Sequence, residues 1–402
     1  MLCPRRRPDY RPRRDRAGRF HAVTAVDTEL PPATGAWRDG DDPGRRKWIT
    51  LPEPLALEAG GTLPGVRIAY ETWGALNTDA SNAVLVLHAL TGDSHVTGPA
   101  EAGHPTPGWW DALIGPGRAL DPARWFVVAP NIVGGCQGST GPASPGPDGR
   151  RWGSRFPLVT ARDAVTAERV LADALGVDAW ALVIGGSMGG MRALEWAATE
   201  PDRVTRLCLL ACPAATSADQ IGWAAPQLAA IRDDPGWSGG DYHDAPPGHG
   251  PHRGLGVARR IAHLSYRSAF ELGERFGRDA QDGEDPWRGG RYAVESYLDH
   301  HARKLVRRFD AMSYVRLTEL MNAHDVGRGR GGTAAALARV TARTLVAGVS
   351  SDRLYPLEQQ AELVAGIPDA GTLRIIDSPY GHDGFLIEAP AVGELVTELL
   401  DR

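Results

Sequence analysis

The chain has 402 residues, of which 42% are hydrophobic and 23% are charged. These are ordinary globular values, and they exclude disorder over most of the chain. Lysine and arginine (44) nearly balance aspartate and glutamate (49), so a net charge of −5 offers no global positive field for nucleic acid or an anionic membrane. We expect a soluble, cytoplasmic protein with one elaborated α/β domain or two average domains.

The cysteines and the apolar runs exclude two further classes. No pair of cysteines has Cys-x-x-Cys spacing, which argues against a disulfide scaffold and against a zinc site. The four cysteines are Cys3, Cys136, Cys208 and Cys212. No apolar run approaches the roughly 20 residues that a membrane helix needs. We therefore expect no metal and no membrane partner.

The N-terminal stretch differs from the rest of the chain. Eight arginines lie in residues 1–19: Arg5, Arg6, Arg7, Arg11, Arg13, Arg14, Arg16 and Arg19. No apolar segment follows them, so the stretch is not a secretory signal. Prolines and glycines continue to about residue 47. We predict a basic, disordered tail over 1–47, with a nucleic-acid-binding arm as the alternative.

From residue 48 onward, short apolar runs alternate with helical patterns. Runs this short and this rich in Val, Ile and Leu are typical of strands buried on both faces. The predicted strands are Val66–Trp73, Val84–His88, Trp125–Ala129, Ala181–Gly185, Arg206–Ala211, Thr344–Val349 and Leu373–Ile376. The predicted helices between them are Ala161–Leu175, Met188–Thr199, Leu357–Ala365 and Ala391–Leu400. This alternation predicts an α/β fold with a mostly parallel central sheet.

One stretch breaks the alternation. Residues 214–330 show helical periodicity and almost no strand signal. The predicted helices there are Ile221–Arg232, Gly256–Arg275, Val294–Arg308 and Tyr314–Ala323. A helical insertion between two strands of a parallel sheet is a lid. We therefore predict a core formed by 48–213 and 331–402, with a helical lid over 214–330.

A serine lies at the predicted turn between Ala181–Gly185 and the next helix. Residues 185–189 read Gly-Gly-Ser-Met-Gly, a Gly-x-Ser-x-Gly motif in the strand–turn–helix context of a nucleophile elbow. In so tight a turn, side chains at Gly185 and Gly189 would collide with neighbouring backbone. We predict that Ser187 is a nucleophile with its hydroxyl exposed at the carboxyl edge of the sheet. An ordinary glycine-rich turn is the alternative.

A serine hydroxyl needs a base, and in this fold the acid and then the base follow the serine along the chain. Asp352 and His382 each come shortly after one of the last two predicted strands, so we assign them as acid and base. The rivals are Asp377 for the acid, and His324 or the pair His300-His301 for the base. For Asp352, a solvated loop charge is the alternative.

The oxyanion hole of such an enzyme needs two backbone N–H groups. We assign one to Met188, the residue after the nucleophile, and the other to Leu90, in the loop after Val84–His88. To this point the residues indicate a serine-nucleophile enzyme of the α/β-hydrolase type, for which an esterase or another hydrolase is the default activity.

Longer strings are more specific. The most specific is NIVGGCQGSTGP at residues 131–142. The others are LHALTG (87–92), GWWD (108–111), GGSMGGMRALEW (185–196), GGDY (239–242), ARRIAHLSY (258–266), YLD (297–299), HDVGRG (324–329), SDRLYP (351–356) and YGHDGF (380–385). Through these strings the chain, from about residue 48 to 402, resembles the homoserine O-acetyltransferase family.

The resemblance implies an α/β-hydrolase core with a helical lid and a reaction of methionine biosynthesis. In that reaction an acetyl group passes from acetyl-CoA to the hydroxyl of L-homoserine, giving O-acetyl-L-homoserine and CoA. It implies a ping-pong mechanism through acetyl-Ser187, no bound cofactor beyond the co-substrate acetyl-CoA, and a homodimer joined through the lid helices. The family's triad positions match the serine, aspartate and histidine assigned above.

The resemblance also implies three contacts to homoserine, through Arg259, Tyr266 and Asp383. Arg259 suits the carboxylate by paired N–H bonds, and Asp383 suits the ammonium. Alternatives on the same scaffold are a succinyl-CoA donor or a serine-type acceptor. Two other classes stay open, a plain hydrolase and a non-catalytic binding protein, although the latter would have no need of all three triad residues.

Overall fold

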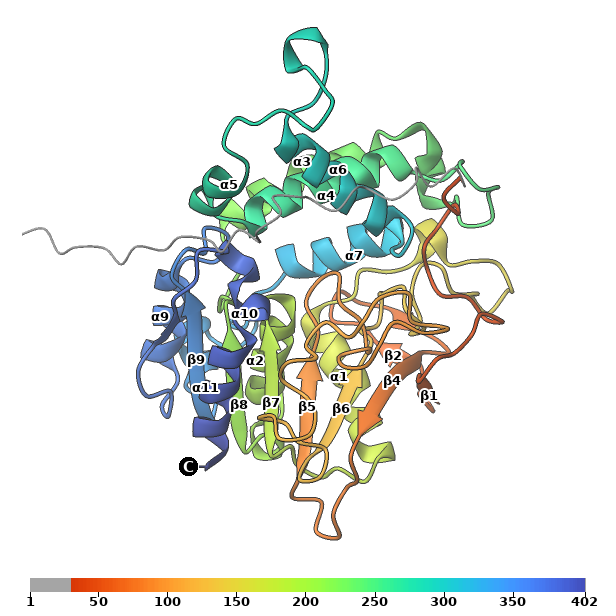
Figure 1. Cartoon of the computed structure of the whole chain (residues 1–402). Coiled ribbons are helices and arrows are strands. Elements are labelled where there is room, and N and C mark those ends of the chain that lie inside the picture. Colours follow the sequence, from red (N-terminus) through yellow and green to blue (C-terminus); the bar gives the residue numbers. More distant parts are fainter. Residues whose placement is uncertain (1–29, 402) are drawn as a thin grey trace, which may run out of the picture. The chain divides into compact units, whose positions relative to one another are not determined.

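The computed structural model describes residues 30–401 of the chain, coloured from red to blue in Figure 1. Of the described residues, 31–401 belong to one compact unit. The arginine-rich stretch and the rest of residues 1–29 lie outside the described residues, so the predicted tail is described only from Leu30 onward. In the described part of the chain, no helix combines the length and the apolar character that crossing a membrane requires.

Eight strands form one sheet in the order β1-β4-β6-β5-β7-β8-β9-β10. Every neighbouring pair from β6 to β10 is parallel, whereas β1 and β6 both pair antiparallel with β4. The strands are β1 (Lys47–Thr50), β4 (Arg67–Trp73), β5 (Ala83–Leu87), β6 (Phe126–Pro130), β7 (Leu182–Gly186), β8 (Arg206–Leu210), β9 (Arg343–Val349) and β10 (Arg374–Ile376). The predicted mostly parallel sheet is confirmed. Sequence reasoning missed β1 and the small pair β2 (Leu55–Ala56) and β3 (Thr62–Leu63), which contain no apolar run.

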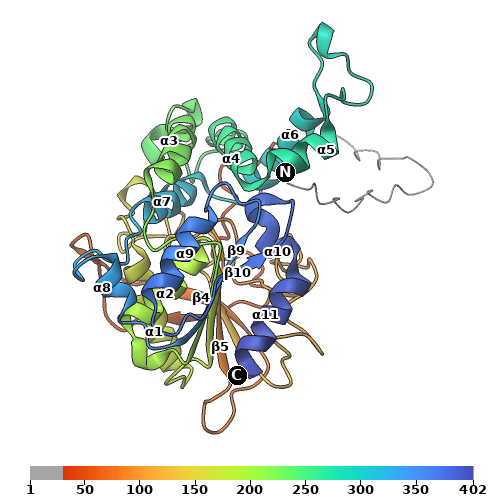
Figure 2. The same cartoon turned by 90° about the vertical axis from the view of Figure 1, so that its left-hand side faces the viewer.

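Helices cover both faces of the sheet, as Figure 2 shows. On one side lie α1 (Ala161–Ala174), α2 (Met188–Thr199), α8 (Thr333–Leu337) and α9 (Leu357–Gly366), and on the other α10 (Gly384–Ile387) and α11 (Ala389–Asp401). Successive strand residues point to opposite faces, so Leu85 packs in the core shared with α1 and α2, and its neighbour Val84 packs in the core shared with α11. Burial on both faces explains the continuous apolar runs in the sequence.

The predicted helical insertion between β8 and β9 is confirmed. It contains α3 (Ala218–Arg232), α4 (His252–Tyr266), α5 (Ala269–Phe276), α6 (Ala293–Val306) and α7 (Ala311–Asn322). These helices lie over the carboxyl ends of the parallel strands, above the arrowheads in Figure 1. They therefore cover the edge of the sheet at which a nucleophile elbow presents its serine.

The prediction of one continuous helix over Gly256–Arg275 is wrong. Arg267 is extended, with φ −105° and ψ 149°, and it separates α4 from α5. The hydroxyl of Ser268 accepts the backbone N–H of Glu271 at 3.0 Å and so caps a new helix. A serine followed three residues later by a glutamate is a capping signal, and this signal was overlooked in favour of the apolar periodicity.

The predicted disordered tail is also wrong for its last part. Residues 31–46 contact both the insertion and the core through specific bonds: the hydroxyl of Thr34 donates to the buried Asp310 of the insertion at 2.7 Å, and the N–H of Trp37 donates to the carbonyl of Cys136 at 2.9 Å. Ala33 and Ala36 are buried. The prolines and glycines of this stretch therefore belong to an extended segment whose partners are distant in the sequence.

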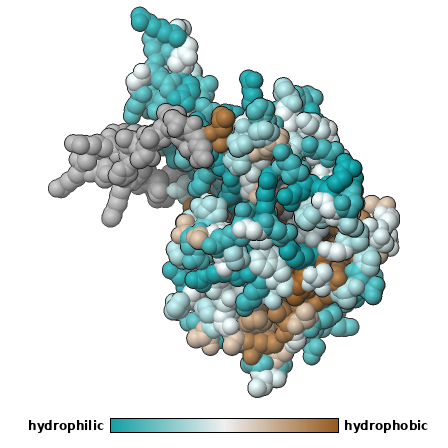
Figure 3. All heavy atoms as spheres, turned by 90° about the vertical axis from the view of Figure 1, so that its right-hand side faces the viewer, coloured by the Kyte–Doolittle hydropathy of each residue, from teal (hydrophilic) through white to brown (hydrophobic). Residues whose placement is uncertain are grey.

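Strand β1 is an edge of the sheet, since it pairs with β4 alone. Figure 3 shows the face on this side of the molecule, where hydrophilic side chains cover much of the surface and apolar ones gather in its lower part. The edge strand itself carries the exposed Lys47, whose Nζ donates to Thr72 at 2.9 Å. A lysine on an edge strand discourages pairing with another chain.

Candidate active site

Ser187 lies at the turn between β7 and α2 and has a left-handed backbone, with φ 57° and ψ −127°. A Cβ on Gly185 would lie 2.3 Å from the backbone of Gly189, and one on Gly189 would lie 2.0 Å from the carbonyl oxygen of Leu87. The predicted reason for both glycines is confirmed. The prediction of an exposed serine is wrong, because Ser187 is only 7% exposed under the insertion.

His382 and Asp352 are in direct contact. Nδ1 of His382 lies 2.7 Å from Oδ2 of Asp352, and Oδ1 of Asp352 accepts the backbone N–H groups of Leu354 at 2.8 Å and Tyr355 at 2.9 Å. Both side chains are buried. Burial lowers the pKa of His382, but the charge and hydrogen bond of Asp352 more than offset it, so the pKa is raised. The arrangement orients the imidazole and stabilises its charged form.

Packing joins the serine turn to the histidine loop. The ring of Phe385 lies 5.4 Å from the ring of His382, and the same phenylalanine lies 2.4 Å from the place where a Cβ on Gly186 would be. His382 occupies a short 3₁₀ turn, Gly381–Asp383. One aromatic side chain therefore contacts both the residue before Ser187 and the candidate base.

The rival residues lie elsewhere. Asp377 is exposed and accepts the hydroxyl of Ser350 at 3.0 Å, while Asp352 is the carboxylate that contacts His382. His324 is buried with Nε2 3.3 Å from the carbonyl of Pro213. His301 stacks within the insertion, 3.9 Å from the ring of His263.

The loop after β5 carries Leu90, the predicted oxyanion donor, and its geometry depends on His88. The backbone N–H of Ile132 donates to Nε2 of His88 at 3.2 Å, and Nδ1 lies 2.8 Å from the carbonyl of Ala89. Since Nε2 accepts, the proton is on Nδ1 and donates to Ala89. A peptide unit is planar and trans, so the direction of the Ala89 carbonyl sets the direction of the Leu90 N–H.

His88 is a functional candidate that sequence reasoning missed. Burial and the nearby charge of Arg192 lower the pKa of His88 to about 3, which keeps the ring neutral and its tautomer constant. The sequence feature that could have identified His88 is its position directly after the buried strand β5 and two residues before Leu90, the predicted oxyanion donor.

The other predicted oxyanion donor, Met188, is the first residue of α2. The N–H groups in the first turn of a helix have no carbonyl partner within that helix, and the helix dipole favours an anion there.

Arg259 on α4 has two guanidinium nitrogens without a hydrogen-bond partner among the described residues. Its guanidinium lies 5.7 Å from the ring centre of Tyr266, and among residues 30–401 no group accepts a hydrogen bond from its buried Nε and Nη1. Asp383 is half-buried, and desolvation raises its pKa even though His382, Arg259 and Arg267 act in the opposite direction. Opposite charges therefore face one another beside the candidate base, which is the pattern a zwitterionic ligand requires.

A cavity adjoins these groups. Leu90, Tyr266 and Tyr355 line it, together with Thr216, Gln220, Trp223, Ala224, Gln227, Ser265, Thr318, Met321, Asn322 and Leu354. The rings of Tyr355 and Tyr266 lie 5.1 Å and 5.9 Å from the ring of His382. The cavity wall therefore includes the predicted oxyanion donor and two tyrosines that pack near the candidate base, while Ser187, Asp352 and His382 are not among its lining residues. Its walls are mostly apolar and carry a few amides and hydroxyls, as in small-molecule sites.

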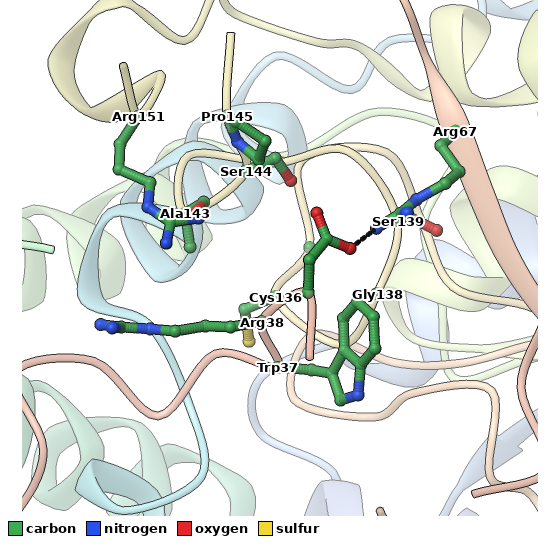
Figure 4. Close-up of a pocket in the computed structure, with 12 residues that line it drawn as sticks. Trp37, Arg38, Arg67, Cys136, Gly138, Ser139, Ala143, Ser144, Pro145 and Arg151 are labelled. Atoms are coloured by element: carbon green, nitrogen blue, oxygen red, sulfur yellow. Dashed lines mark hydrogen bonds and ion pairs between the residues drawn. The ribbon is translucent and has the colours of Figure 1, made fainter. Parts of the chain in front are cut away.

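A second hollow, shown in Figure 4, is lined by three arginines and, unlike the first cavity, by none of the residues predicted for the site. Each guanidinium there has a protein partner: Arg67 pairs with Asp39 at 2.7 Å, Arg38 donates to the carbonyl of His243 at 2.5 Å, and Arg151 donates to the carbonyl of Ala143 at 2.9 Å. We assign no chemistry to this hollow.

One cluster in the described part of the chain has metal-ligand types: Glu71, His95 and His104. The two imidazoles are stacked, with centroids 3.9 Å apart and planes at 12°, so their lone pairs lie in separate planes. His95 has a nitrogen 3.1 Å from Glu71 and the other 3.1 Å from the carbonyl of Pro99, so both donate. Burial lowers the pKa of His95, but the hydrogen bond and charge of Glu71 outweigh this effect, so the pKa of His95 is raised. The cluster is a buried ion pair and does not fit a metal ion.

Comparison with known proteins places the chain. It matches the family described as "alpha/beta hydrolase fold" over residues 82–389. Homoserine O-acetyltransferase from Thermobifida fusca is 70% identical over 93% of this chain and 99% of its own length. The crystal structure of homoserine O-acetyltransferase from Bacillus anthracis is 27% identical with a TM-score of 0.80, covering 89% of this chain and 97% of its own. The crystal structure of esterase E22 is 25% identical with a TM-score of 0.80, and the match covers 88% of this chain and 99% of the esterase chain.

The fold is that of an alpha/beta hydrolase, and this chain carries a helical insertion above the carboxyl ends of the strands. Within this class, the chain belongs to the homoserine O-acetyltransferase family, and is an acyltransferase. The family resemblance drawn from the sequence is confirmed.

Proposed function

We propose that the protein transfers an acetyl group from acetyl-CoA to the hydroxyl of L-homoserine through an acetyl-Ser187 intermediate. The observation that carries the choice of acceptor is the guanidinium of Arg259, near Asp383 and the candidate base, whose buried Nε and Nη1 have no hydrogen-bond partner among the described residues. An α-amino acid presents a carboxylate and an ammonium to such a pair, whereas a simple ester presents neither. Family membership supports the same reaction.

In the first half-reaction, His382 accepts the proton of the Ser187 hydroxyl as its oxygen attacks the thioester carbonyl. The oxyanion is stabilised by the N–H groups of Leu90 and Met188. The C–S bond then breaks, the proton passes from His382 to the CoA sulfur, and acetyl-Ser187 remains. Asp352 holds the imidazole with Nδ1 protonated, so that Nε2 is free to act as the base.

In the second half-reaction, homoserine binds with its carboxylate on Arg259 and its ammonium on Asp383, against the ring of Tyr266. His382 removes the proton of its hydroxyl, the oxygen attacks the acetyl carbonyl, and the Ser187 oxygen leaves with the proton from His382. Holding the hydroxyl beside the ester supplies the advantage of proximity over water. The chemistry needs no bound cofactor, since CoA is a substrate.

Hydrolysis is the second candidate function, because structural relatives include proteins described as esterase E22 and as an acetylester hydrolase from Corynebacterium glutamicum, the latter 28% identical. In a hydrolase, water would replace homoserine in the second half-reaction. The burial of Ser187 under the insertion supports restricted access of water. We therefore place transfer ahead of hydrolysis.

We further propose that the enzyme works in the cytoplasm as a homodimer joined through the insertion. Four large apolar side chains are exposed in the insertion: Ile221 (42%), Val257 (42%), Phe270 (62%) and Trp287 (94%). Apolar side chains that form one contiguous exposed patch are typical of a surface that binds a partner, and the proposal assigns these side chains to the dimer interface. Sedimentation of the purified protein checks the dimer, and a monomer at micromolar concentration would contradict it.

The deciding experiment follows free thiol release from acetyl-CoA with and without L-homoserine, and with succinyl-CoA in parallel. We expect release that depends on homoserine and prefers acetyl-CoA. Equal release without homoserine would make the protein a thioesterase or hydrolase, and preference for succinyl-CoA would change the donor. Ser187→Ala should abolish release and leave the fold intact, so substantial turnover by this variant would refute the covalent intermediate.

A further inference from the structure

The break between α4 and α5 docks directly on the loop that carries the candidate base. A Cβ on Gly381 would lie 2.6 Å from the carbonyl oxygen of Tyr266 and 2.8 Å from the backbone of Arg267. The hydroxyl of Ser268 donates to the carbonyl of Pro379. The extended residue at the break, Arg267, therefore points its side chain toward the histidine loop, where a continuous helix would have placed it elsewhere.

The side chain of Arg267 is buried, at 8% exposure, and it connects two carboxylates. Its Nε and Nη2 donate to Glu271 at 3.2 Å and 2.7 Å, and its Nη1 lies 3.5 Å from Oδ2 of Asp383. The guanidinium also stacks over the ring of Tyr380, 5.1 Å from its centre. A planar guanidinium that makes two bonds to one carboxylate has a single orientation, so its third nitrogen has a defined place beside Asp383.

We propose that Arg267, anchored by Glu271, positions the carboxylate of Asp383 to receive the ammonium group of the acceptor amino acid. Arg267 acts through Asp383 and does not itself contact the reacting atoms. The inference rests on the proposed function, because it takes Asp383 to be the ammonium ligand. It assigns Arg267 to the acceptor half-reaction alone.

The charges around Asp383 explain why such a residue is needed. The groups that face it are His382 on its own loop, Arg259 and Tyr266 on α4, Arg267 at the break, and Tyr297 on α6. When acceptor binds, the carboxylate of the ligand occupies Arg259, and His382 becomes charged only during catalysis. Arg267 is then the cation that keeps the half-buried carboxylate of Asp383 ionised and oriented while the ammonium approaches.

The test compares two acceptors that differ only in the amino group, L-homoserine and 4-hydroxybutanoate, in Arg267→Met. We expect the ratio of kcat/KM for homoserine to that for 4-hydroxybutanoate to fall about 10- to 100-fold, the usual effect of a hydrogen bond to a charged group. We expect this fall to come from a higher KM for homoserine, with kcat little changed. Arg267→Lys, which keeps the charge, should recover part of the ratio, and Glu271→Gln should lower it less.

The donor half-reaction is the internal control. The burst of p-nitrophenol from p-nitrophenyl acetate measures acylation of Ser187 and should be unchanged in all three variants. Arg275→Met is the matched control, since Arg275 also lies near Glu271, at 3.5 Å, but on the more exposed side of α5. It should leave both acceptors and the burst unchanged.

The outcomes separate the inference from the function on which it rests. Equal losses with both acceptors, or a ratio unchanged from wild type, would show that Arg267 only holds the break in place and would overturn the proposal. Should Arg267→Met fail to fold, an unchanged ratio in Glu271→Gln and Arg267→Lys would overturn it equally. A wild-type protein without homoserine-dependent turnover would instead refute the proposed function.

Discussion

Asp352→Asn should remove catalysis while leaving the active-site geometry in place, because the substitution forces the wrong tautomer on His382. Oδ1 of Asp352 accepts two backbone N–H groups, at 2.8 Å and 2.9 Å. In the variant only the amide oxygen can take that place, because an NH₂ group there would face two backbone N–H donors and could accept neither hydrogen bond. The NH₂ group must then face Nδ1 of His382, now 2.7 Å from Oδ2. Nδ1 becomes an acceptor, and the proton moves to Nε2.

A proton on Nε2 prevents His382 from deprotonating Ser187. We expect turnover to fall by roughly 10⁴-fold, or about 5.5 kcal/mol of activation free energy, the size of this effect where an aspartate orients a catalytic histidine. The burst of p-nitrophenol from p-nitrophenyl acetate measures it at the acylation step, and thermal unfolding measures stability, which should change little.

Asp377→Asn is the control for this experiment, since Asp377 is the rival carboxylate and is exposed. It should keep wild-type turnover. Two results would refute the reasoning: more than about one tenth of wild-type turnover in Asp352→Asn, or an equal loss in Asp377→Asn.

Three further predictions follow from the same geometry. Acylation requires neutral His382, and Asp352 raises its pKa above the ordinary value of 6.5, so kcat/KM for acetyl-CoA should fall as the pH drops through a value above 6.5; a limb below pH 6 would contradict this. His88→Gln should lower kcat by about 10²-fold with little change in KM. His88→Asn should lower kcat less, because only the asparagine keeps a donor near the Ala89 carbonyl. Steady-state kinetics measures both variants, and the reverse order of kcat would refute the role given to His88. Gly189→Ala, whose Cβ would lie 2.0 Å from a carbonyl oxygen, should lose about 3 kcal/mol of stability or more, whereas Gly222→Ala, with nothing within 4 Å, should gain about 0.5 kcal/mol. Urea unfolding measures both, and equal stabilities would contradict the steric argument.

Features with a local cause could be read from the sequence. The buried strands were recognisable because parallel strands covered on both faces are apolar at every position. The serine turn was recognisable because Gly185 and Gly189 are required by contacts within a few residues of the motif and with the adjacent strand. The positions of Asp352 and His382 followed from the order of the triad along the chain.

Features that depend on distant partners could not be read in the same way. The tail prediction failed over residues 31–46 because partners of this segment such as Cys136 and Asp310 lie 99 and 276 residues away from Trp37 and Thr34. A stretch rich in proline and glycine also carries no periodic signal of its own. The helix prediction failed at Arg267 because apolar spacing continued through a serine cap. His88 was missed because its importance lies in two hydrogen bonds to backbone groups.

The sequence by itself determined the class of the protein, its order of strands and helices, and the residues that the nucleophile turn requires, since these follow from local sterics and hydrophobic periodicity. Only the tertiary structure decided which carboxylate meets Nδ1 of His382, which cation remains unpaired beside Asp383, and where the insertion docks on the histidine loop. Those choices depend on contacts between loops far apart in the chain, and a loop's path is set by packing that no short stretch of sequence contains.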